Sequence, residues 1–197
     1  MPPRTPLELL RDRLPYNTRA EIIGGVLVVR PPSTARQSRV ASRLWSQLDT
    51  ELGGGLYDGS MPGEWLFVQR VGVCLPRHLV HESEEVEYLV PDIAGWRSSR
   101  APDELGVGLF VEVPDLVCDV LDARPTLGDL GKRDVYAAMG VPAYWLVHAR
   151  ERWVEVCELV ASGVYRCERH HYQPKLSVVP FGGELNLRAI FEAGREQ

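Results

Sequence analysis

Asp119 interrupts an otherwise apolar run, Leu116–Leu121, and this run constrains the fold more than any other segment. A short, nearly continuous apolar run is typical of a strand that is covered on both faces of its sheet. A helix is expected over residues 127–139, with Thr126 as its N-cap and Gly140 after its last turn. Residues 143–147 are expected to form another buried strand. The chain is therefore expected to have an α/β fold, with helices packed on a mixed β-sheet.

The remaining segments fit the same fold class, beginning with an N-terminal β-hairpin. Residues 21–29 hold two apolar runs around Gly24-Gly25, a pair that suits a tight turn. Five further elements are expected in chain order: a helix at 34–52, a strand at 65–74, a loop or hairpin tip at 78–87, a strand at 92–96, and a closing hairpin of 153–160 and 165–168. A chain of 197 residues is expected to be a single domain, residues 1–197, with a core of about 16–168 and a C-terminal extension at 169–197.

Composition excludes some classes of protein. A formal net charge of −5 counts against a protein that coats DNA without specificity, but it allows a local basic groove. The four cysteines form no CxxC pair and are expected to be small buried hydrophobes in a reducing compartment. The sequence shows neither a signal peptide nor an apolar run of the roughly 18 residues that span a bilayer. A cytoplasmic protein without a membrane partner is expected.

Two acidic residues and a lysine carry the chemistry that the sequence suggests. Asp119 lies in mid-strand, where an unpaired carboxylate is costly to bury. Asp92 precedes a strand that can pair beside the strand of Asp119. Lys132 shares a helix face with Asp129 and Tyr136. Taken singly, Asp119 fits a structural acid, and Lys132 fits a surface ion pair with Asp129. Taken together, two carboxylates and an ammonium suit a divalent cation and an activated water, which is the chemistry of phosphodiester hydrolysis.

Several stretches resemble the Uma-two family of predicted restriction endonucleases, within the PD-(D/E)xK nuclease superfamily. They are residues 20–27, Val90-Pro91-Asp92, Leu116–Leu121, residues 129–132 with Tyr136, and residues 140–147. The resemblance covers about residues 16–168. It implies a restriction-endonuclease-like core in which Asp92 and Asp119 bind Mg²⁺, with Mn²⁺ as the alternative. Leu121 stands where the superfamily's usual lysine would be, so Lys132 on the following helix would serve in its place.

The resemblance also implies further members of the site. Glu21 is a candidate additional catalytic acid, and the alternative for it is a solvent-facing strand glutamate. Gln37 and Tyr136 are candidates to contact the catalytic residues without binding the metal themselves. Lys132 would orient the attacking water or stabilise the charge that develops on the phosphate. A homodimer is expected by analogy, because nucleases of this fold commonly pair to cut both strands.

Three positions depart from the pattern of the family. The strand acid is usually glutamate, whereas Asp119 is one methylene shorter, which bears on catalytic competence because Mg²⁺ demands near-octahedral geometry. No histidine stands near Arg36 or Gln37, and His148 follows the 143–147 strand where the family usually has aspartate. The second and third departures are not expected to touch the metal.

DNA is the expected partner, and the first helix offers a basic face for it. Arg36, Arg39 and Arg43 fall within about 60° of one another at 100° per residue. They are candidates to pair with phosphates, although an ordinary solvated face fits them equally well. The acidic residues Glu82, Glu84, Glu85 and Glu87 would repel a duplex beside the site, so they are expected to form a loop away from the DNA, a solvated tip or part of a partner surface.

Three functions remain open at this point. A metal-dependent DNA endonuclease ranks first. A catalytically inactive module that keeps the nuclease fold for binding or regulation ranks second, favoured by the shorter acid and the acidic net charge. A magnesium-dependent phosphodiesterase acting on RNA or nucleotides ranks third, because the sequence lacks the interleaved aromatic and basic residues of a single-strand platform.

Overall fold

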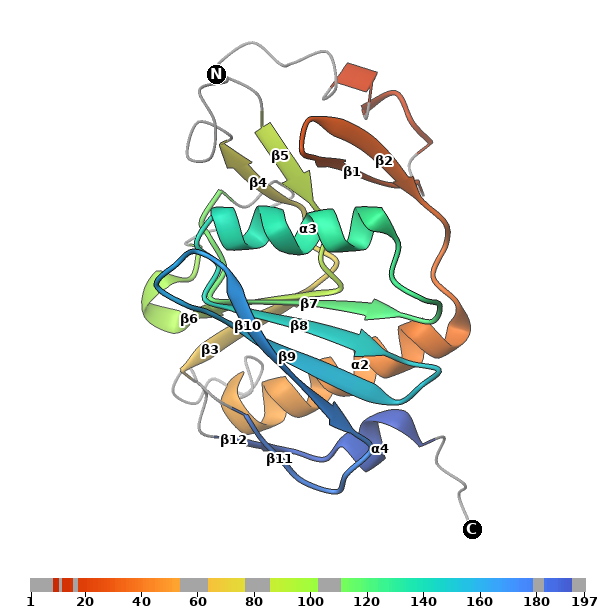
Figure 1. Cartoon of the computed structure of the whole chain (residues 1–197), viewed down its shortest axis with the longest axis vertical. Helices are drawn as coiled ribbons and strands as arrows, with labels where there is room; N and C mark the ends of the chain where they lie inside the picture. Colours follow the sequence, from red (N-terminus) through yellow and green to blue (C-terminus); the bar gives the residue numbers. More distant parts are fainter. Residues whose placement is uncertain are drawn as a thin grey trace.

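The described part of the chain is built on three β-sheets, the largest of which has six strands (Figure 1). This computed structural model describes residues 9–10, 12–15, 18–53, 64–76, 86–102, 111–178 and 183–192. The large sheet has the order β10-β9-β8-β7-β6-β3, with β3 (Trp65–Gln69), β6 (Ile93–Arg97), β7 (Leu116–Leu121), β8 (Ala143–His148), β9 (Trp153–Leu159) and β10 (Tyr165–His171). Strands β7 and β8 are parallel and the other neighbours are antiparallel, which makes the sheet mixed, as expected.

Two smaller sheets and the helices α2, α3 and α4 surround the six-stranded sheet. The four-stranded sheet has the order β2-β1-β5-β4, with β1 (Arg19–Ile23), β2 (Val26–Arg30), β4 (Val73–Pro76) and β5 (Val86–Leu89). Strands β11 (Leu176–Val178) and β12 (Gly183–Leu185) pair near the C-terminus. The helices are α2 (Ala35–Leu48), which continues into a π-helical turn at Asp49–Gly53, α3 (Leu127–Ala138) and α4 (Leu187–Phe191). A 3₁₀ turn follows β6 at Ser98–Arg100.

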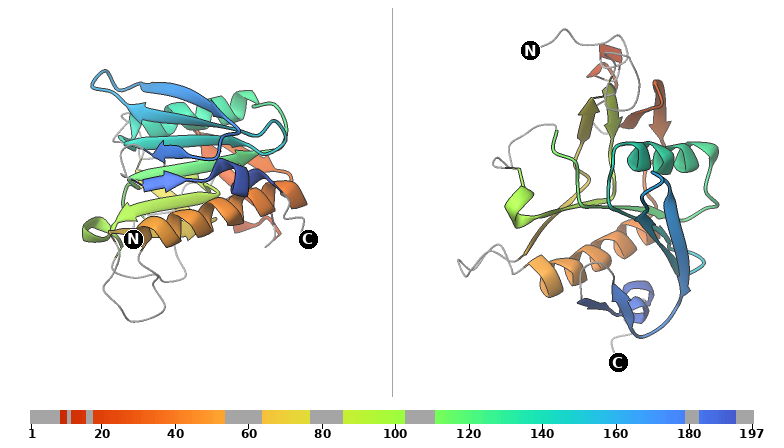
Figure 2. Two further views of the ribbon diagram at one scale, coloured as in Figure 1. Left: turned by 90° about the horizontal axis from the view of Figure 1, so that it is seen from below. Right: turned by 60° about the vertical axis from the view of Figure 1, so that its left-hand side comes forward.

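The helices cover opposite faces of the six-stranded sheet, with α2 and α4 on one face and α3 on the other (Figure 2). Alternate residues of β7 therefore enter two different clusters. Cys118 and Val120 pack with Leu44 of α2, whereas Val117 packs with Tyr136 of α3. This is the burial on both faces that the apolar run predicts.

Local sequence accounts for where the hairpin and the helices begin and end. Gly24 and Gly25 have φ values of 58° and 74°, as a primed hairpin turn requires, because side chains with a Cβ are strained there. Thr34 and Thr126 each form a capping box at the start of α2 and α3. Gly140 follows α3 with a φ of 77°, as expected for a C-terminal glycine.

Residues 65–74, expected as one strand, form parts of two. β3 joins the six-stranded sheet and β4 joins the four-stranded one. The extended conformation is interrupted between them at Arg70, which has a φ of 50°. β5 begins within the segment expected to be a loop, and Glu87 on it is buried. The other three residues of the acidic run, Glu82, Glu84 and Glu85, lie outside the described residues.

Residues 169–192 are not merely an extension. β10 runs to His171, and Leu176, Leu185, Leu187 and Ile190 are buried in the same cluster as α2. The sequence prediction missed these elements because they are short and carry little hydrophobic periodicity. The core therefore extends beyond the expected boundary at residue 168.

The expectation of four unbridged cysteines is wrong for one pair. Cys157 and Cys167 occupy opposite positions on β9 and β10 and are joined in a disulfide. Cys74 and Cys118 are buried thiols, as expected. The pairing depends on the hairpin register, which the cysteine spacing alone does not give. Within the described residues, no helix combines the length and apolarity needed to cross a membrane.

Candidate active site

Asp119 faces α3 because side chains alternate along β7. It lies two residues after Val117, which packs on the α3 side of the sheet, and it is 6% exposed. Its Oδ1 is 2.7 Å from the Nζ of Lys132, whose side chain is 2% exposed. A buried carboxylate and a buried ammonium thus neutralise each other, which removes most of the cost of burying either one alone.

Asp92 is brought beside Asp119 by the register of β6 and β7. Ile93 pairs with Cys118 in this antiparallel ladder, so the preceding residue, Asp92, comes next to Asp119. The Oδ2 of Asp92 accepts a hydrogen bond of 2.8 Å from the backbone N–H of Val120. This bond joins the start of one strand to the middle of the next and fixes the carboxylate at the site.

Glu21 reaches the same place from the hairpin. Its Oε1 is 2.7 Å from the Nζ of Lys132 and accepts a bond of equal length from the N–H of Val90. Its Oε2 is 2.9 Å from the Nε of Arg30 on β2. Glu21 is fully buried, so the alternative of a solvent-facing glutamate is wrong.

Asp129 and Lys132 do not form the surface ion pair expected as the alternative for them. Asp129 is 2.7 Å from Nη1 of Arg30, and its other oxygen accepts from the backbone N–H of Thr126 at the start of α3. Lys132 points instead toward Asp119 and Glu21. Residues three apart on a helix share a face, but the two groups here have different partners.

A second cation, Arg19 on β1, contacts both acids of the sheet. Its Nη1 is 3.0 Å from Oδ1 of Asp92, and its Nη2 is 3.8 Å from Oδ1 of Asp119. Nη2 also donates to the carbonyl of Val90 at 2.6 Å. Two carboxylates are therefore held between two cations, Arg19 and Lys132.

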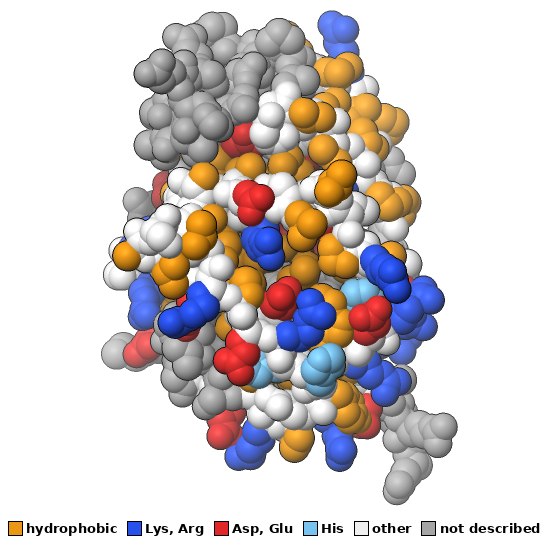
Figure 3. All heavy atoms as spheres, in the orientation of Figure 1, with side chains coloured by type: hydrophobic (Ala, Val, Ile, Leu, Met, Phe, Trp, Pro, Cys, Tyr) orange, Lys and Arg blue, Asp and Glu red, His pale blue; other side chains and the backbone are white. Residues whose placement is uncertain are grey.

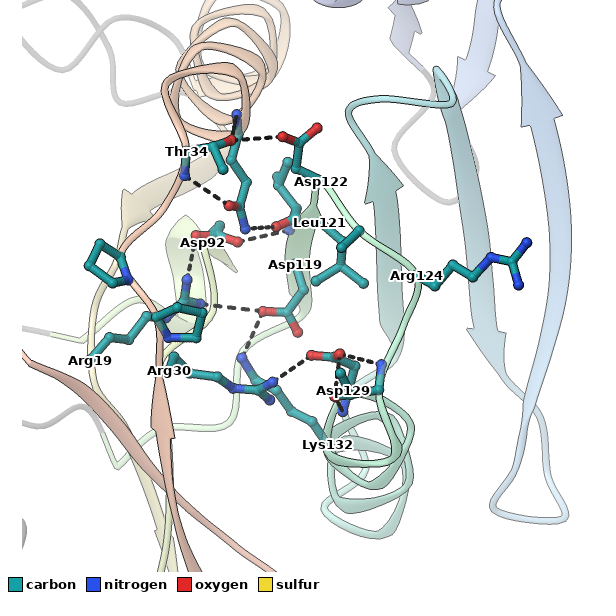
Figure 4. A pocket seen from close by; sticks show the side chains of 16 residues that line it. Arg19, Arg30, Thr34, Asp92, Asp119, Leu121, Asp122, Arg124, Asp129 and Lys132 are labelled. Carbon is teal, nitrogen blue, oxygen red and sulfur yellow. Dashed lines mark hydrogen bonds and ion pairs between the residues drawn. The ribbon is translucent and has the colours of Figure 1, made fainter.

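These side chains line a pocket of about 310 Å³ (Figure 4). Asp92, Asp119, Lys132, Arg19, Arg30 and Asp129 all border it, and so do Gln37, Thr34 and Asp122. In Figure 4, Arg19 and Lys132 approach Asp119 from the hairpin and from α3, while Arg124 extends away from the acids. Elements far apart in the sequence thus supply the walls of one cavity.

Burial and neighbouring charges move the pKa values of Glu21 and Asp119 in opposite directions. Burial alone would raise the pKa of Glu21, but the charges of Lys132 and Arg19 and the hydrogen bonds to Glu21 lower it to about 2. Burial raises the pKa of Asp119, and the nearby carboxylates Glu21 and Asp92 raise it further against the opposing effect of Lys132. Glu21 is therefore held as an anion in the folded protein, and Asp119 binds a proton more readily than a free aspartate does.

The donor set suits a hard divalent cation. Oδ2 of Asp119 is buried and has no hydrogen-bond partner among the described residues, and an orphaned carboxylate oxygen in a pocket is a ready ligand. Asp92 and Asp119 are the candidate ligands at this pocket, and the described residues include no group of three or more His, Cys, Asp or Glu side chains placed to hold a metal. Mg²⁺ commonly uses one or two carboxylates and completes its shell with waters and substrate phosphates, so the residues present fit it.

Gln37 and Tyr136 lie on opposite sides of β7. Nε2 of Gln37 donates to the carbonyl of Val120 at 2.6 Å, which ties the start of α2 to the strand that carries Asp119. The ring of Tyr136 is fully buried, and its centroid is 5.7 Å from Nζ of Lys132. The pKa of Tyr136 is raised well above its usual value, chiefly by burial, so its hydroxyl stays protonated.

The three arginines of α2 do not share one environment. Arg36 is 3.1 Å from Oδ1 of Asp122, at the rim of the pocket. Arg39 lies with Arg36 around a neighbouring cavity. Arg43 donates to the backbone carbonyl of Glu192 beyond α4, which commits it to holding the C-terminal segment.

The two hairpin arginines were not foreseen from the sequence. Arg19 and Arg30 are register partners at the open end of the hairpin. One signal was available in the sequence. The expected hairpin register brings two arginines opposite each other, and like charges in that position destabilise a ladder unless acids lie nearby.

His148, the third departure from the pattern of the family, is buried. Its ring accepts a hydrogen bond of 3.1 Å from the backbone N–H of Glu151, so it closes the β8–β9 turn.

Comparison with known proteins agrees with this architecture. A structure from Anabaena variabilis, described as a putative nuclease belonging to DUF820, superimposes with a TM-score of 0.70 at 17% sequence identity. The alignment covers 94% of this chain and 96% of that chain. At this identity the likeness shows the fold, which is restriction-endonuclease-like as expected. The search of curated proteins found no match.

A family model identifies the chain more directly than the solved structure. The model, described as "Putative restriction endonuclease", matches residues 7–192, and this range includes Glu21, Asp92, Asp119 and Lys132. It also extends through α4, in agreement with the packing of the C-terminal segment into the core. The chain belongs to the Uma2 family.

Proposed function

We propose that this chain is a Mg²⁺-dependent endonuclease that hydrolyses phosphodiester bonds in DNA, with Mn²⁺ as the alternative metal. One observation carries the proposal: Asp92, Asp119 and Lys132 border a single pocket, and Asp119 keeps one carboxylate oxygen without a partner among the described residues. Membership of a nuclease family supports the reaction class. The DNA substrate and the metal are parts of the proposal.

Asp92 and Asp119 would hold the metal. When bound there, Mg²⁺ would polarise the scissile phosphate and lower the pKa of a coordinated water. Asp92 is fixed for this role by the N–H of Val120, and Gln37 holds the carbonyl of the same residue. The protein thus contributes a rigid pair of carboxylates at the junction of two strands.

Lys132 would donate to the attacking water or to a phosphate oxygen on which charge develops. Glu21 and the carbonyl of Val90 bind the Nζ of Lys132, at 2.7 and 3.2 Å, and direct it toward Asp119. Glu21 in this arrangement positions the lysine, and its own oxygens are engaged by Lys132, Arg30 and Val90. Its proposed catalytic part is therefore indirect.

A plasmid-cleavage assay tests this function. The purified parent should convert supercoiled plasmid to cut forms with Mg²⁺ and should be inactive with EDTA. Asp92→Asn and Asp119→Asn should each lower the rate of cleavage at least about 100-fold. Lys132→Met should bind the metal but lose turnover. Asp134→Asn is the matched control, because Asp134 is an exposed aspartate on the same helix. Parental cleavage by Asp119→Asn would refute the assignment.

A second candidate function is a non-catalytic binding module. Arg19 and Lys132 already neutralise the two carboxylates, and Asp119 has a shorter side chain than the glutamate usual in the family. Calorimetric titration of Mg²⁺ into the parent and Asp119→Ala separates the two functions. Binding that is lost in the variant supports the nuclease, whereas a parent that binds no metal with or without duplex supports the module.

The proposal extends to assembly and location. Cleavage of both strands would follow from a homodimer, one protomer for each strand, working on DNA in the cytoplasm. Sedimentation of the parent with and without duplex measures the assembly, and a monomer in both states would contradict it.

A further inference from the structure

Four arginines meet beside the candidate active site, two from a helix and two from a turn. Arg36 and Arg39 come from α2, and Arg150 and Arg152 come from the turn between β8 and β9. They line a second pocket of about 540 Å³, whose described lining contains no acidic side chain. Lys and Arg side chains gather at the right-hand edge of Figure 3, over the β8–β9 turn and the start of α2.

This arginine cluster adjoins the catalytic pocket through Asp122. Asp122 borders the catalytic pocket, and its Oδ1 is 3.1 Å from Nη1 of Arg36. Its backbone carbonyl accepts from Nε of Arg150 at 3.1 Å. One acid thus connects the two cavities, and a chain of phosphates lying in one would continue toward the other.

The positive charge of the cluster exceeds what the protein neutralises. Asp122 pairs with Arg36 and lies 3.8 Å from Arg150, but neither Arg39 nor Arg152 has an ion-pair partner in the part of the chain that the structure describes. The side chains of Arg36 and Arg150 are 52% and 66% exposed. Like charges gathered at one place repel one another, so a polyanion is the ligand whose binding relieves this repulsion.

The backbone of the turn is strained where one of these arginines stands. Arg152 has a φ of 58°, in the left-handed region that favours glycine or asparagine. A backbone hydrogen bond of 2.8 Å from Arg152 to the carbonyl of His148 closes the turn. The side chain of Arg152 lies over the ring of Tyr172, 5.8 Å from its centroid, and borders the second pocket.

We infer that this arginine cluster is a phosphate-binding subsite that receives the DNA backbone next to the scissile bond. The inference rests on the proposed function and adds the path of the substrate across the protein. It also divides the basic face of α2, since Arg36 and Arg39 belong to the subsite and Arg43 does not. Contacts of this kind position the duplex without reading its sequence, so they would act on all sequences alike.

Binding of a labelled duplex in EDTA, measured by anisotropy over a range of salt concentrations, tests the inference without cleavage. The double variant Arg39→Gln, Arg152→Gln is chosen because these two arginines form no ion pair with any of the described residues. The matched control is Arg166→Gln, Lys175→Gln, which removes two exposed charges outside the cluster. The double variant should weaken binding roughly tenfold and reduce the slope of log K against log salt by about 2, and the control should do neither.

Two further measurements distinguish the sources of failure. The charge-preserving variant Arg39→Lys, Arg152→Lys should restore the slope, and thermal unfolding should show that the Gln pair is folded. Parental affinity and slope in the Gln pair would overturn the subsite while leaving the nuclease proposal standing. A parent that neither binds nor cuts duplex DNA would overturn both, and loss confined to an RNA duplex would assign the subsite to RNA instead.

Discussion

Asp92 and Asp119 are held by two cations, Arg19 and Lys132, and only Lys132 was expected from the sequence. Arg19 binds Oδ1 of Asp92 and lies 3.8 Å from Oδ1 of Asp119, so a divalent ion approaching both carboxylates competes with a guanidinium. Asp92 and Asp119 raise the pKa of Arg19 against the opposing effect of burial, so its charge is permanent. The metal affinity of this pocket should therefore depend on the ease with which Arg19 moves.

Arg19→Met should bind Mg²⁺ more tightly than the parent, by roughly tenfold, which corresponds to about 1.4 kcal/mol. The reason is that the variant frees Oδ1 of Asp92 without removing a carboxylate. Calorimetric titration measures the change, with Arg166→Met as the control for loss of a distant charge. Weaker binding in Arg19→Met would show that the arginine serves to hold Asp92 in place.

Glu21 should make the stability of the protein depend on acid pH. The pKa of Glu21 is about 2 in the folded protein against an ordinary value of 4.5, so the carboxylate contributes stability that is fully present above pH 4.5. That contribution, about 3 kcal/mol, is lost as pH falls from 4.5 toward 2.

Glu21→Gln lacks this titration, so its deficit in unfolding free energy relative to the parent should narrow as pH falls from 6 to 3. Urea unfolding at each pH measures the deficit, with Glu168→Gln as the exposed control. A deficit that stays constant over this range would contradict the ionised state assigned to Glu21.

At the scale of elements, the β9–β10 hairpin shows how register decides chemistry. Alternation along the hairpin places Cys157 inside and opposite Cys167, whereas the sequence shows only two cysteines ten positions apart. The hairpin begins at Trp153, directly after the β8–β9 turn that carries Arg150 and Arg152, so the disulfide links the two strands of the element that follows this turn.

Protein purified and unfolded without reductant should react with a thiol reagent at two cysteines, Cys74 and Cys118, and at four after reduction. Reduction should also lower the free energy of unfolding by up to about 3 kcal/mol, because the bond closes a short loop in the unfolded chain. Thiol titration and urea unfolding check the two effects. Four reactive thiols before reduction would exclude the bridge in solution.

At the scale of the whole molecule, the C-terminal segment completes the layer that α2 begins. Leu187 and Ile190 of α4 are fully buried against the same cluster as Leu44 and Leu48. Arg43 bonds to the carbonyl of Glu192, which anchors the end of α4 to α2. Helix α2, which carries Gln37, Arg36 and Arg39, therefore depends on residues near the C-terminus for its packing.

Ile190→Ala should destabilise the protein by about 2–5 kcal/mol, because it opens a cavity in a closed core. Urea unfolding measures the loss. Val164→Ala, at a position 57% exposed, is the control and should change stability by no more than about 0.5 kcal/mol. A loss in Ile190→Ala as small as that of the control would mean that α4 does not pack on α2 in solution.

The sequence by itself determined the elements whose signals are local. Gly24-Gly25 specified a turn, Thr126 specified the start of α3, and the apolar run around Asp119 specified a central strand. It also singled out Asp119, because a buried charge in an apolar run demands a partner, and Asp92 and Lys132 through their combination with it. These features depend on neighbours within a few residues, so they can be read along the chain.

The tertiary structure decided which charges and thiols meet. Arg19 reaches Asp92 across 73 positions, and Arg30 reaches Asp129 across 99. The partner of Cys157 and the burial of α4 likewise depend on how distant segments dock. Electrostatic and packing energies depend on distances of a few ångströms in space, and spacing along the sequence does not contain those distances.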